Sequence, residues 1–235
     1  MGRIISITVM TYNIRSAMGN DGRVDLGRIA GVIKEVEPDL VALQEVDQFW
    51  RRSGKVDQAR ELARMLHMHH RFGPALVRGR ARFGNAVLSR LEELSYHHHS
   101  LPSNRENRGM LEMYFDFDGR LICMAALHLG LTQAERSMHL NYILNRLTLI
   151  DIPLLVAGDF NMTPANLEMK RIRSVLQDCC DAVQSELYTY PSTNPTQRID
   201  YIFHSPDWQT REVTTIPSQA SDHLPLVARL ALRRE

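Results

Sequence analysis

The stretch Leu154-Leu155-Val156-Ala157-Gly158-Asp159-Phe160-Asn161 shows the pattern that decides the fold. Its apolar residues predict a short buried strand, and the polar residues that follow lie where that strand ends. The same arrangement occurs beside other apolar runs, at Thr11-Tyr12-Asn13, Gln44-Glu45, His128, Asp200 and Ser221-Asp222-His223. Loops at the strand ends of a rigid sheet are where catalytic side chains collect. The sequence therefore predicts one site at an edge of a sheet.

Strands alternate with amphipathic helices along the rest of the chain. The expected helices run from about residue 25 to the residue before Pro38, and over residues 56–66, 132–149 and 163–180. The expected strands cover residues 4–13, 40–45, 85–89, 110–117, 121–127, 153–157, 198–204, 212–216 and 226–232. Asp118-Gly119 predicts a hairpin turn. This order favours two sheets packed face to face and covered by helices, in a single domain of residues 1–235. Periodicity alone leaves open a doubly wound sheet with an antiparallel appendage.

The composition is that of an ordinary folded chain. Of the 235 residues, 44% are hydrophobic and 23% are charged, which argues against disorder and fibrous repeats. No apolar run approaches the roughly 18 residues that span a membrane, so no transmembrane segment is expected. The three cysteines are odd in number and form no CxxC pair, which favours free thiols in a reducing, cytoplasmic compartment. No feature indicates an obligate protein partner.

The basic residues are almost all arginine, which accounts for 25 of the 28. A GC-rich genome explains this bias, and so does phosphate binding, since guanidinium groups hold phosphate oxygens bidentately. The net charge of +1 does not indicate a dedicated polyanion binder. The segment Arg71–Arg82 is the exception, because it contains four arginines and no acidic residue. Its glycines and proline predict a loop.

The side chains at the predicted strand ends are oxygen and imidazole donors, with no sulfur among them. Oxygen ligands select Mg²⁺ or Mn²⁺, and Mg²⁺ usually takes one or two carboxylates and leaves room for water and phosphate. Taken singly, Glu45 fits a surface residue, and Gly158-Asp159 or Asp222-His223 fit turns or caps. Six such groups at one edge indicate a metal-assisted site instead.

Two histidine-rich runs, residues 67–70 and 97–99, suggest a transition-metal site at first sight. Neither has the i, i+4 pair of a zinc-binding helix, and neither has a nearby cysteine. We interpret both runs as structural.

Six short motifs occur in order along nearly the whole chain: Thr11-Tyr12-Asn13-Ile14, Leu43-Gln44-Glu45, Gly84–Ser89, Gly158–Asn161, Arg198–Ile202 and Ser221–Pro225. Together they resemble the endonuclease/exonuclease/phosphatase superfamily, which has a deoxyribonuclease-I-like fold. The resemblance implies a four-layer α/β sandwich, in which two mixed, mostly antiparallel sheets pack face to face and are flanked by helices. It also implies Mg²⁺-dependent hydrolysis of a phosphate ester, with Mn²⁺ as an alternative ion, at one edge of the two sheets.

The resemblance assigns Glu45 as the main metal ligand, with Asn13 beside it and Asp222 assisting. Arg108, at the start of an expected strand, and Asn85 are predicted to contact the substrate phosphate. The metal would offset the charge that builds up on the phosphoryl oxygens.

The remaining matched residues take catalytic roles. Asp159 would orient or deprotonate the attacking water, and Asn161 would hydrogen-bond the phosphate oxygens. Asp200 and His223 would form a carboxylate–imidazole dyad, which fixes the tautomer and raises the basicity of the ring. His128 would contact the scissile phosphate or protonate the leaving oxygen.

Departures from the family pattern narrow the range of superfamily members that this sequence resembles. Arg15 stands where apurinic-site endonucleases usually carry Asp, and those enzymes lack an equivalent of His128. Ala126 stands where sphingomyelinase-like members carry Asn. Deoxyribonuclease-like and lipid-directed members are therefore closer. The first motif together with Asp21–Leu26 is most similar to bacterial metal-dependent hydrolases of the superfamily, which implies no particular substrate.

Three functions remain open. A phosphodiesterase or phosphatase acting on a lipid head group or a small molecule is favoured, because the charge is balanced. A DNA or RNA nuclease needs a basic track beside the site, which the Arg71–Arg82 segment would supply in part. A non-catalytic phosphate-binding module would have lost metal or dyad residues, and none is missing at the matched positions.

Overall fold

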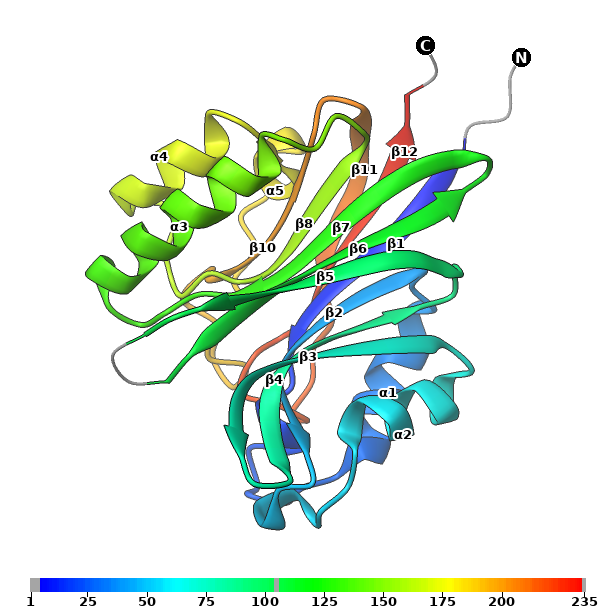
Figure 1. Ribbon diagram of the computed structural model, residues 1–235, viewed down its shortest axis with the longest axis vertical. Coiled ribbons are helices and arrows are strands. Elements are labelled where there is room, and N and C mark those ends of the chain that lie inside the picture. Colours follow the sequence, from blue (N-terminus) through cyan, green and yellow to red (C-terminus); the bar gives the residue numbers. More distant parts are fainter. Residues whose placement is uncertain (1–4, 104–105, 234–235) are drawn as a thin grey trace.

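Two mixed six-stranded sheets pack face to face in the part of the chain that the structure describes (Figure 1). The structure is a computed structural model and describes residues 5–103 and 106–233. The first sheet contains, in spatial order, β11 (Trp208–Thr215), β12 (Leu226–Leu232), β1 (Ser6–Asn13), β2 (Leu40–Gln48), β4 (Ala81–Ser89) and β3 (His69–Arg78). The second contains, in spatial order, β5 (Glu93–Leu101), β6 (Arg108–Phe117), β7 (Arg120–His128), β8 (Leu154–Asp159), β10 (Asp200–His204) and β9 (Gln177–Asp178). This is the arrangement that the sequence favours.

Helices cover the outer face of each sheet and complete four layers (Figure 1). The helices α1 (Leu26–Val36) and α2 (Gln58–Leu66) pack on the first sheet, and α3 (Gln133–Leu147) and α4 (Leu167–Arg173) pack on the second. The short elements are η1 (Arg15–Ala17), η2 (Arg51–Ser53) and α5 (Cys179–Ala182). Within residues 5–103 and 106–233, no helix combines the length and apolar character needed to cross a bilayer.

Strand β1 shows how side-chain alternation builds two of the cores. Ile7 and Val9 point between the sheets, whereas Met10 and Tyr12 point outward and pack with the residues of α1 and α2. Successive side chains of a strand lie on opposite faces, so a strand covered on both faces must be apolar on both. Of the expected range 4–13, residue 4 lies outside the described residues.

Local signals in the sequence explain several boundaries. The Asp25 carboxylate accepts hydrogen bonds from the backbone N–H groups of Gly27 and Arg28 and so begins α1. Thr132 and Glu135 form a reciprocal capping box at the start of α3. The predicted turn between β6 and β7 is confirmed, since Asp118 and Gly119 both have positive φ, 55° and 80°.

The expectation of a loop over Arg71–Arg82 is wrong, because these residues form the β3–β4 hairpin. Of the glycines that suggested a loop, Gly79 has a positive φ of 61° and lies at the turn between the two strands, whereas Gly73 lies where strands approach closely. A Cβ atom on Gly84 would lie 2.1 Å from the carbonyl oxygen of Gly73, and a Cβ on Gly73 would lie 2.7 Å from Cδ2 of His98. The register also shifts between Pro74 and Leu76, so the proline lies at an irregularity of an edge strand.

The expected helix over residues 163–180 is also wrong in its extent. Helix α4 ends at Arg173, and the chain then forms β9 before α5 begins at Cys179. Asp178 imposes this break, because its carboxylate accepts from the N–H of Cys180 and pairs with Arg198 over 3.0 Å. The tertiary ion pair overrides the helical pattern of the segment.

The polar strand ends meet at one edge of the sandwich. His128 and Asp159 are neighbours at the ends of the parallel strands β7 and β8. Asp200 begins β10 and pairs in register with Asp159. Asn13 ends β1 in the other sheet. Strand direction and register therefore bring together residues that are far apart in the sequence.

Candidate active site

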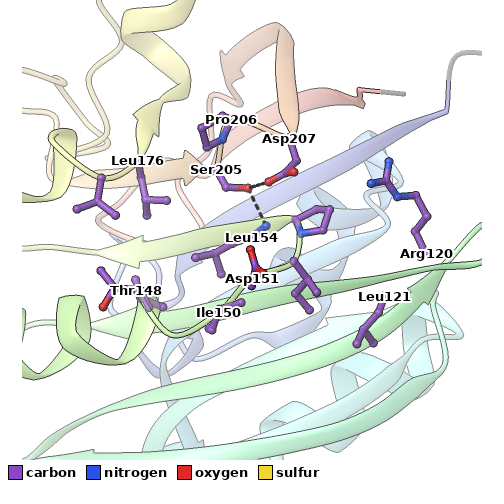
Figure 2. A pocket seen from close by; sticks show the side chains of 14 residues that line it. Arg120, Leu121, Thr148, Ile150, Asp151, Leu154, Leu176, Ser205, Pro206 and Asp207 are labelled. Atoms are coloured by element: carbon purple, nitrogen blue, oxygen red, sulfur yellow. Dashed lines mark hydrogen bonds between the residues drawn. The ribbon is translucent and has the colours of Figure 1, made fainter. Parts of the chain in front are cut away.

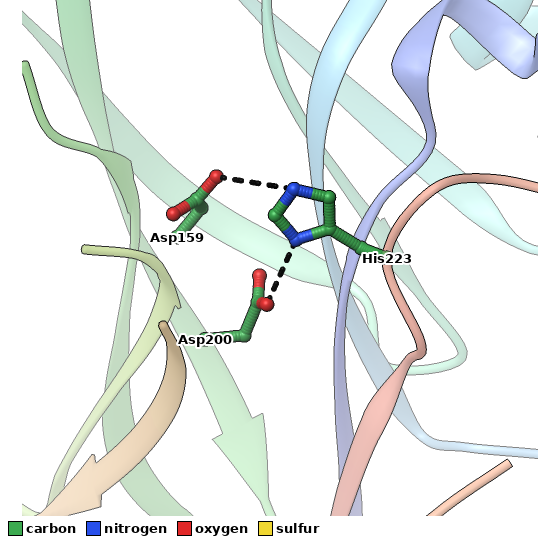
Figure 3. A group of neighbouring side chains, drawn as sticks. All are labelled: Asp159, Asp200 and His223. Carbon is green, nitrogen blue, oxygen red and sulfur yellow. Dashed lines mark hydrogen bonds and ion pairs between the residues drawn. The ribbon is translucent and has the colours of Figure 1, made fainter. Parts of the chain in front are cut away.

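Asp159, Asp200 and His223 form a buried cluster at this edge (Figure 3). Nδ1 of His223 donates a hydrogen bond of 2.9 Å to Oδ2 of Asp200, and its Nε2 lies 3.9 Å from Oδ2 of Asp159. The two carboxylates come from paired strands of the second sheet, while His223 comes from the turn before β12 in the first sheet. The predicted dyad of Asp200 and His223 is thus present in the geometry.

The charges of this cluster are strongly coupled. Burial alone would lower the pKa of His223, but the carboxylate of Asp200 and the hydrogen bond to it raise that pKa to about 10. Burial raises the pKa of Asp159, and the like charge of Asp200 raises it further. At neutral pH His223 is therefore an imidazolium with both ring nitrogens protonated.

Asn13 connects this cluster to Glu45. Its Nδ2 donates to Oδ2 of Asp159 over 3.0 Å and to Oε1 of Glu45 over 3.2 Å. Glu45 lies at an irregularity of β2 between Leu43 and Val46, and it has a positive φ of 57°. Bulges re-aim side chains, and strained non-glycine residues collect at functional sites. Burial raises the pKa of Glu45, so this carboxylate is held in a site that favours a positive neighbour.

Asn161 and His128 both lie next to Asp159. The side-chain N of Asn161 lies 3.1 Å from Nε2 of His128 and donates to the carbonyl oxygen of Leu129 over 3.0 Å. The backbone N–H of Asn161 donates to Oδ1 of Asp159 over 2.9 Å. Burial, with Arg108 nearby, holds the pKa of His128 well below its usual range. His128 is therefore a neutral ring whose Nε2 faces the side chain of Asn161.

The two predicted phosphate contacts lie at the same edge but are already bonded. Arg108 is buried, donates from Nε to the carbonyl oxygen of Leu129 and pairs with Glu106. The side-chain N of Asn85 donates to the carbonyl oxygen of Gly109 over 2.7 Å and so ties β4 to β6 across the sandwich. Both side chains have a structural task in addition to any contact with substrate.

Asp222 differs from its neighbours by its exposure, since 27% of its side chain is accessible. Its Oδ2 lies 3.5 Å from Nε of Arg15, a residue that the sequence suggested only as a departure from the family pattern. Asp222 adjoins His223 but lies outside the buried group of three ligand-bearing side chains.

Two residues at the site were not predicted as site residues from the sequence. Ser221 donates from Oγ to the carbonyl oxygen of Asn13 over 2.7 Å and so fixes the end of β1. The ring of Tyr190 lies 4.9 Å from that of His223. The position of Ser221 inside the Ser-Asp-His motif was a signal for it, whereas nothing in the sequence around Tyr190 was.

A groove of about 810 Å³ lies at the other end of the second sheet (Figure 2). Its lining includes Arg120 and Leu154, at the starts of β7 and β8, and Ser205, just after β10. None of the predicted site residues lines it. This groove is therefore separate from the buried cluster.

The family model of the endonuclease/exonuclease/phosphatase family matches residues 10–223. The chain belongs to this family. The match spans all the predicted site residues, from Asn13 to His223. A comparison with curated proteins gave no match.

Solved structures of the family have the same fold. An endonuclease/exonuclease/phosphatase from Beutenbergia cavernae is similar with a TM-score of 0.82 and 25% identity, over 97% of this chain and 72% of that one. The catalytic domain of human Nocturnin with bound sulfate has a TM-score of 0.80 and 24% identity, over 97% and 94% of the two chains. A mannosyl-6-phosphatase from Bacteroides thetaiotaomicron has a TM-score of 0.75 and 19% identity, over 95% and 99%.

The donor set of this endonuclease/exonuclease/phosphatase family protein fits a hard divalent cation. The ligand atoms of Asp159, Asp200 and His223 lie within 4.8 Å of one another, so this group could hold a metal ion. Its two carboxylates supply the oxygen atoms that a hard cation prefers. Glu45 supplies another, linked to Asp159 through Asn13.

Proposed function

We propose that this protein is a divalent-metal-dependent phosphoesterase that hydrolyses a phosphate ester by attack of water on phosphorus. The observation that carries the proposal is the buried Asp159–His223–Asp200 cluster, with the Asn13–Glu45 pair bonded to it. Isolated buried charges are costly, so a protein that keeps several beside one another at a strand edge has a use for them.

Glu45, Asn13 and Asp222 would hold the ion, which we propose to be Mg²⁺, with Mn²⁺ as a substitute. All three offer oxygen, the donor that Mg²⁺ prefers. When bound, the ion supplies positive charge to the phosphoryl oxygens as negative charge develops on them. The elevated pKa of Glu45 supports this assignment, because a nearby cation would stabilise its ionised form.

The residues of this chain would then position and move the proton of the attacking water. Both oxygens of Asp159 are held in place, one by the side chain of Asn13 and one by the backbone of Asn161. This fixed carboxylate, with its raised pKa, is suited to accept a proton near neutral pH. The His223 imidazolium, oriented by Asp200, would stabilise the charge on phosphorus-bound oxygens.

Asn161, His128, Arg108 and Asn85 would contact the phosphate. The neutral state of His128 favours hydrogen bonding over donation of a proton to the leaving oxygen. Known relatives in this fold include a mannosyl-6-phosphatase and a Nocturnin domain with bound sulfate. These names support a phosphate ester as substrate: a small molecule or a lipid head group first, with nucleic acid as the alternative.

We further propose that residues 1–235 form one domain and that the protein acts in the cytoplasm without an obligate partner. The inter-sheet core supports one domain, because it includes Ile7 near one end of the chain and Leu232 near the other. Cys123, Cys179 and Cys180 are free and buried, which supports a reducing compartment.

Hydrolysis of bis-p-nitrophenyl phosphate and p-nitrophenyl phosphate tests the activity. We expect turnover with Mg²⁺ or Mn²⁺ that EDTA abolishes, and loss of turnover in Glu45→Gln. Glu212→Gln, an exposed residue on β11, is the matched control and is expected to keep full activity. Wild-type rates equal to those of Glu45→Gln under every metal condition would refute the proposal.

A further inference from the structure

The tip of the β3–β4 hairpin carries basic side chains without acidic partners. Arg78, Arg80 and Arg82 are exposed, and none forms an ion pair with another described residue. Arg82 donates only to the side-chain oxygen of Gln48, over 3.1 Å. In Figure 1 the tip extends downward from the sandwich, away from the end where β12 finishes. The positive charge of this tip is therefore open to a ligand.

A rigid platform of arginine and aromatic rings lies against the hairpin. The guanidinium of Arg52 stacks 5.0 Å from the ring of Trp50 and 5.2 Å from that of Phe83, and Arg78 lies 6.0 Å from Trp50. Two hydrogen bonds of 2.8 and 2.7 Å hold Arg52 on the buried carboxylate of Asp47. The platform is thus positioned by a buried carboxylate.

The strands place this platform beside the buried cluster. Phe83 and Asn85 are two residues apart on β4, so both face the space between the sheets, where Asn85 contacts Gly109. Gln48 pairs with Arg82 three residues beyond Glu45 on β2. At about 3.3 Å per strand residue, the backbone of Arg82 thus lies roughly 10 Å along the sheet from Glu45, and Arg78 and Arg80 lie farther toward the tip. Asp47, and more weakly Glu45, raise the pKa of Arg52, as a short separation requires.

We propose that the hairpin tip and the platform, formed by Arg78, Arg80, Arg82, Arg52 and Trp50, are a second phosphate subsite. The preferred substrate then carries another phosphate roughly 10 Å or more from the one that is cleaved. Guanidinium groups bind phosphate through paired hydrogen bonds and remain charged at every physiological pH. The inference rests on the proposed hydrolysis for its meaning, but binding at the subsite can be measured without turnover.

Two sources supply a second phosphate: a flexible nucleic-acid strand and a small bisphosphate. Oligothymidylate represents the first and fructose 1,6-bisphosphate the second. Binding of each is measured in EDTA, and hydrolysis of each is compared with that of bis-p-nitrophenyl phosphate in Mg²⁺. Failure of all hydrolysis would refute the proposed function, whereas the binding measurements in EDTA decide the subsite independently.

The variant R78Q/R80Q tests the subsite, and Arg211→Gln on the opposite edge strand β11 is its matched control. For the probe that uses the subsite, we expect the double variant to raise Kd and KM about tenfold while kcat is kept, the size of one lost charge-assisted contact. For oligothymidylate, the slope of log Kd against log salt should also fall by about one for each arginine removed. R78K/R80K should bind with intermediate affinity, because it keeps the charge and loses the paired hydrogen bonds.

The probe that loses affinity identifies the source of the second phosphate. Equal Kd and KM values for R78Q/R80Q and Arg211→Gln with both probes would overturn the proposal. So would a wild-type protein that binds neither probe in EDTA.

Discussion

The two ends of strands β7, β8 and β10 are chemically opposite. One end holds His128, Asp159 and Asp200, which are buried and charged or bonded to charged groups. The other end opens into the groove of about 810 Å³, where the hydroxyl of Ser205 accepts from the N–H of Leu154 and donates to Asp207 (Figure 2). Ser205 and Asp207 are only half-buried, whereas the charged groups of the cluster are buried. The proposed chemistry therefore lies at the end marked by buried charge and not at the end with the larger cavity.

The largest expected effect is a loss of activity from a substitution at the cluster end but not at the groove end. Asp200→Asn should lower kcat about 10³-fold, because an amide neither orients His223 nor keeps it protonated. Steady-state rates on bis-p-nitrophenyl phosphate measure this loss. Asp151→Asn, the same exchange in the lining of the groove, should leave kcat unchanged. Equal losses in both variants would remove the distinction between the ends.

The groove end should matter for stability instead. Leu176→Ala truncates a side chain that is 4% exposed in the core of the second sheet, and it should lower the free energy of unfolding by about 2–3 kcal/mol. Urea unfolding gives the change, and kcat should remain within twofold of wild type. A large fall in kcat for a protein that is still folded would connect the groove to catalysis.

Glu112, a buried acid on β6, shows how a buried charge can contribute to stability. Burial would raise the pKa of Glu112, but its hydrogen bonds with Arg146 and Tyr114 bring it down to about 2. Because this pKa is below the ordinary value of 4.5, the pair stabilises the fold above pH 4.5, and this contribution is lost as the pH falls through 2.

Glu112→Gln should therefore destabilise the protein by about 2 kcal/mol at pH 7, toward the low end for a broken buried pair because Arg146 keeps partial access to water. Urea unfolding at several pH values should show the difference from wild type shrinking below pH 4.5. A difference that is independent of pH would mean that packing, rather than charge, is lost in the variant.

The smallest expected effect is on stability and has the opposite sign. Asp159→Asn should raise the free energy of unfolding by about 1 kcal/mol at pH 7, since burial disfavours the charged carboxylate. The folded pKa of Asp159 is raised, so its ionisation costs stability as the pH rises above the ordinary value of 3.8. The gain in the variant should accordingly be larger at pH 7 than at pH 4. A less stable variant at pH 7 would show that the ion pairs of Asp159 outweigh its burial.

The sequence predicted the apolar framework and the identity of the buried cluster because both depend on patterns of residues that are close in the sequence. The alternation along β1 and the Asp25 cap need only neighbouring residues. The hairpin at Arg71–Arg82 was missed because Gly79 marks only its turn, whereas Gly73 is required by a close contact with His98 that no local pattern reveals. The break before α5 was missed for the same reason, since Asp178 pairs with Arg198 twenty residues away.

The site itself was only partly predictable. The motifs predicted which residues would carry the chemistry, and the structure brings Asn13, Glu45, Asp159, Asp200 and His223 into one bonded group. The positive φ of Glu45 and the neutral state of His128 depend on register and burial, which sequence patterns do not contain.

The hydrogen bond from Asn13 to Asp159 joins side chains that are 146 positions apart and lie in different sheets. Neither half of the sandwich, folded alone, owns a complete set of reactive groups. Hydrolytic competence would consequently require the two sheets to be packed against each other. A newly synthesised or partly unfolded chain would therefore not hydrolyse the phosphate esters around it.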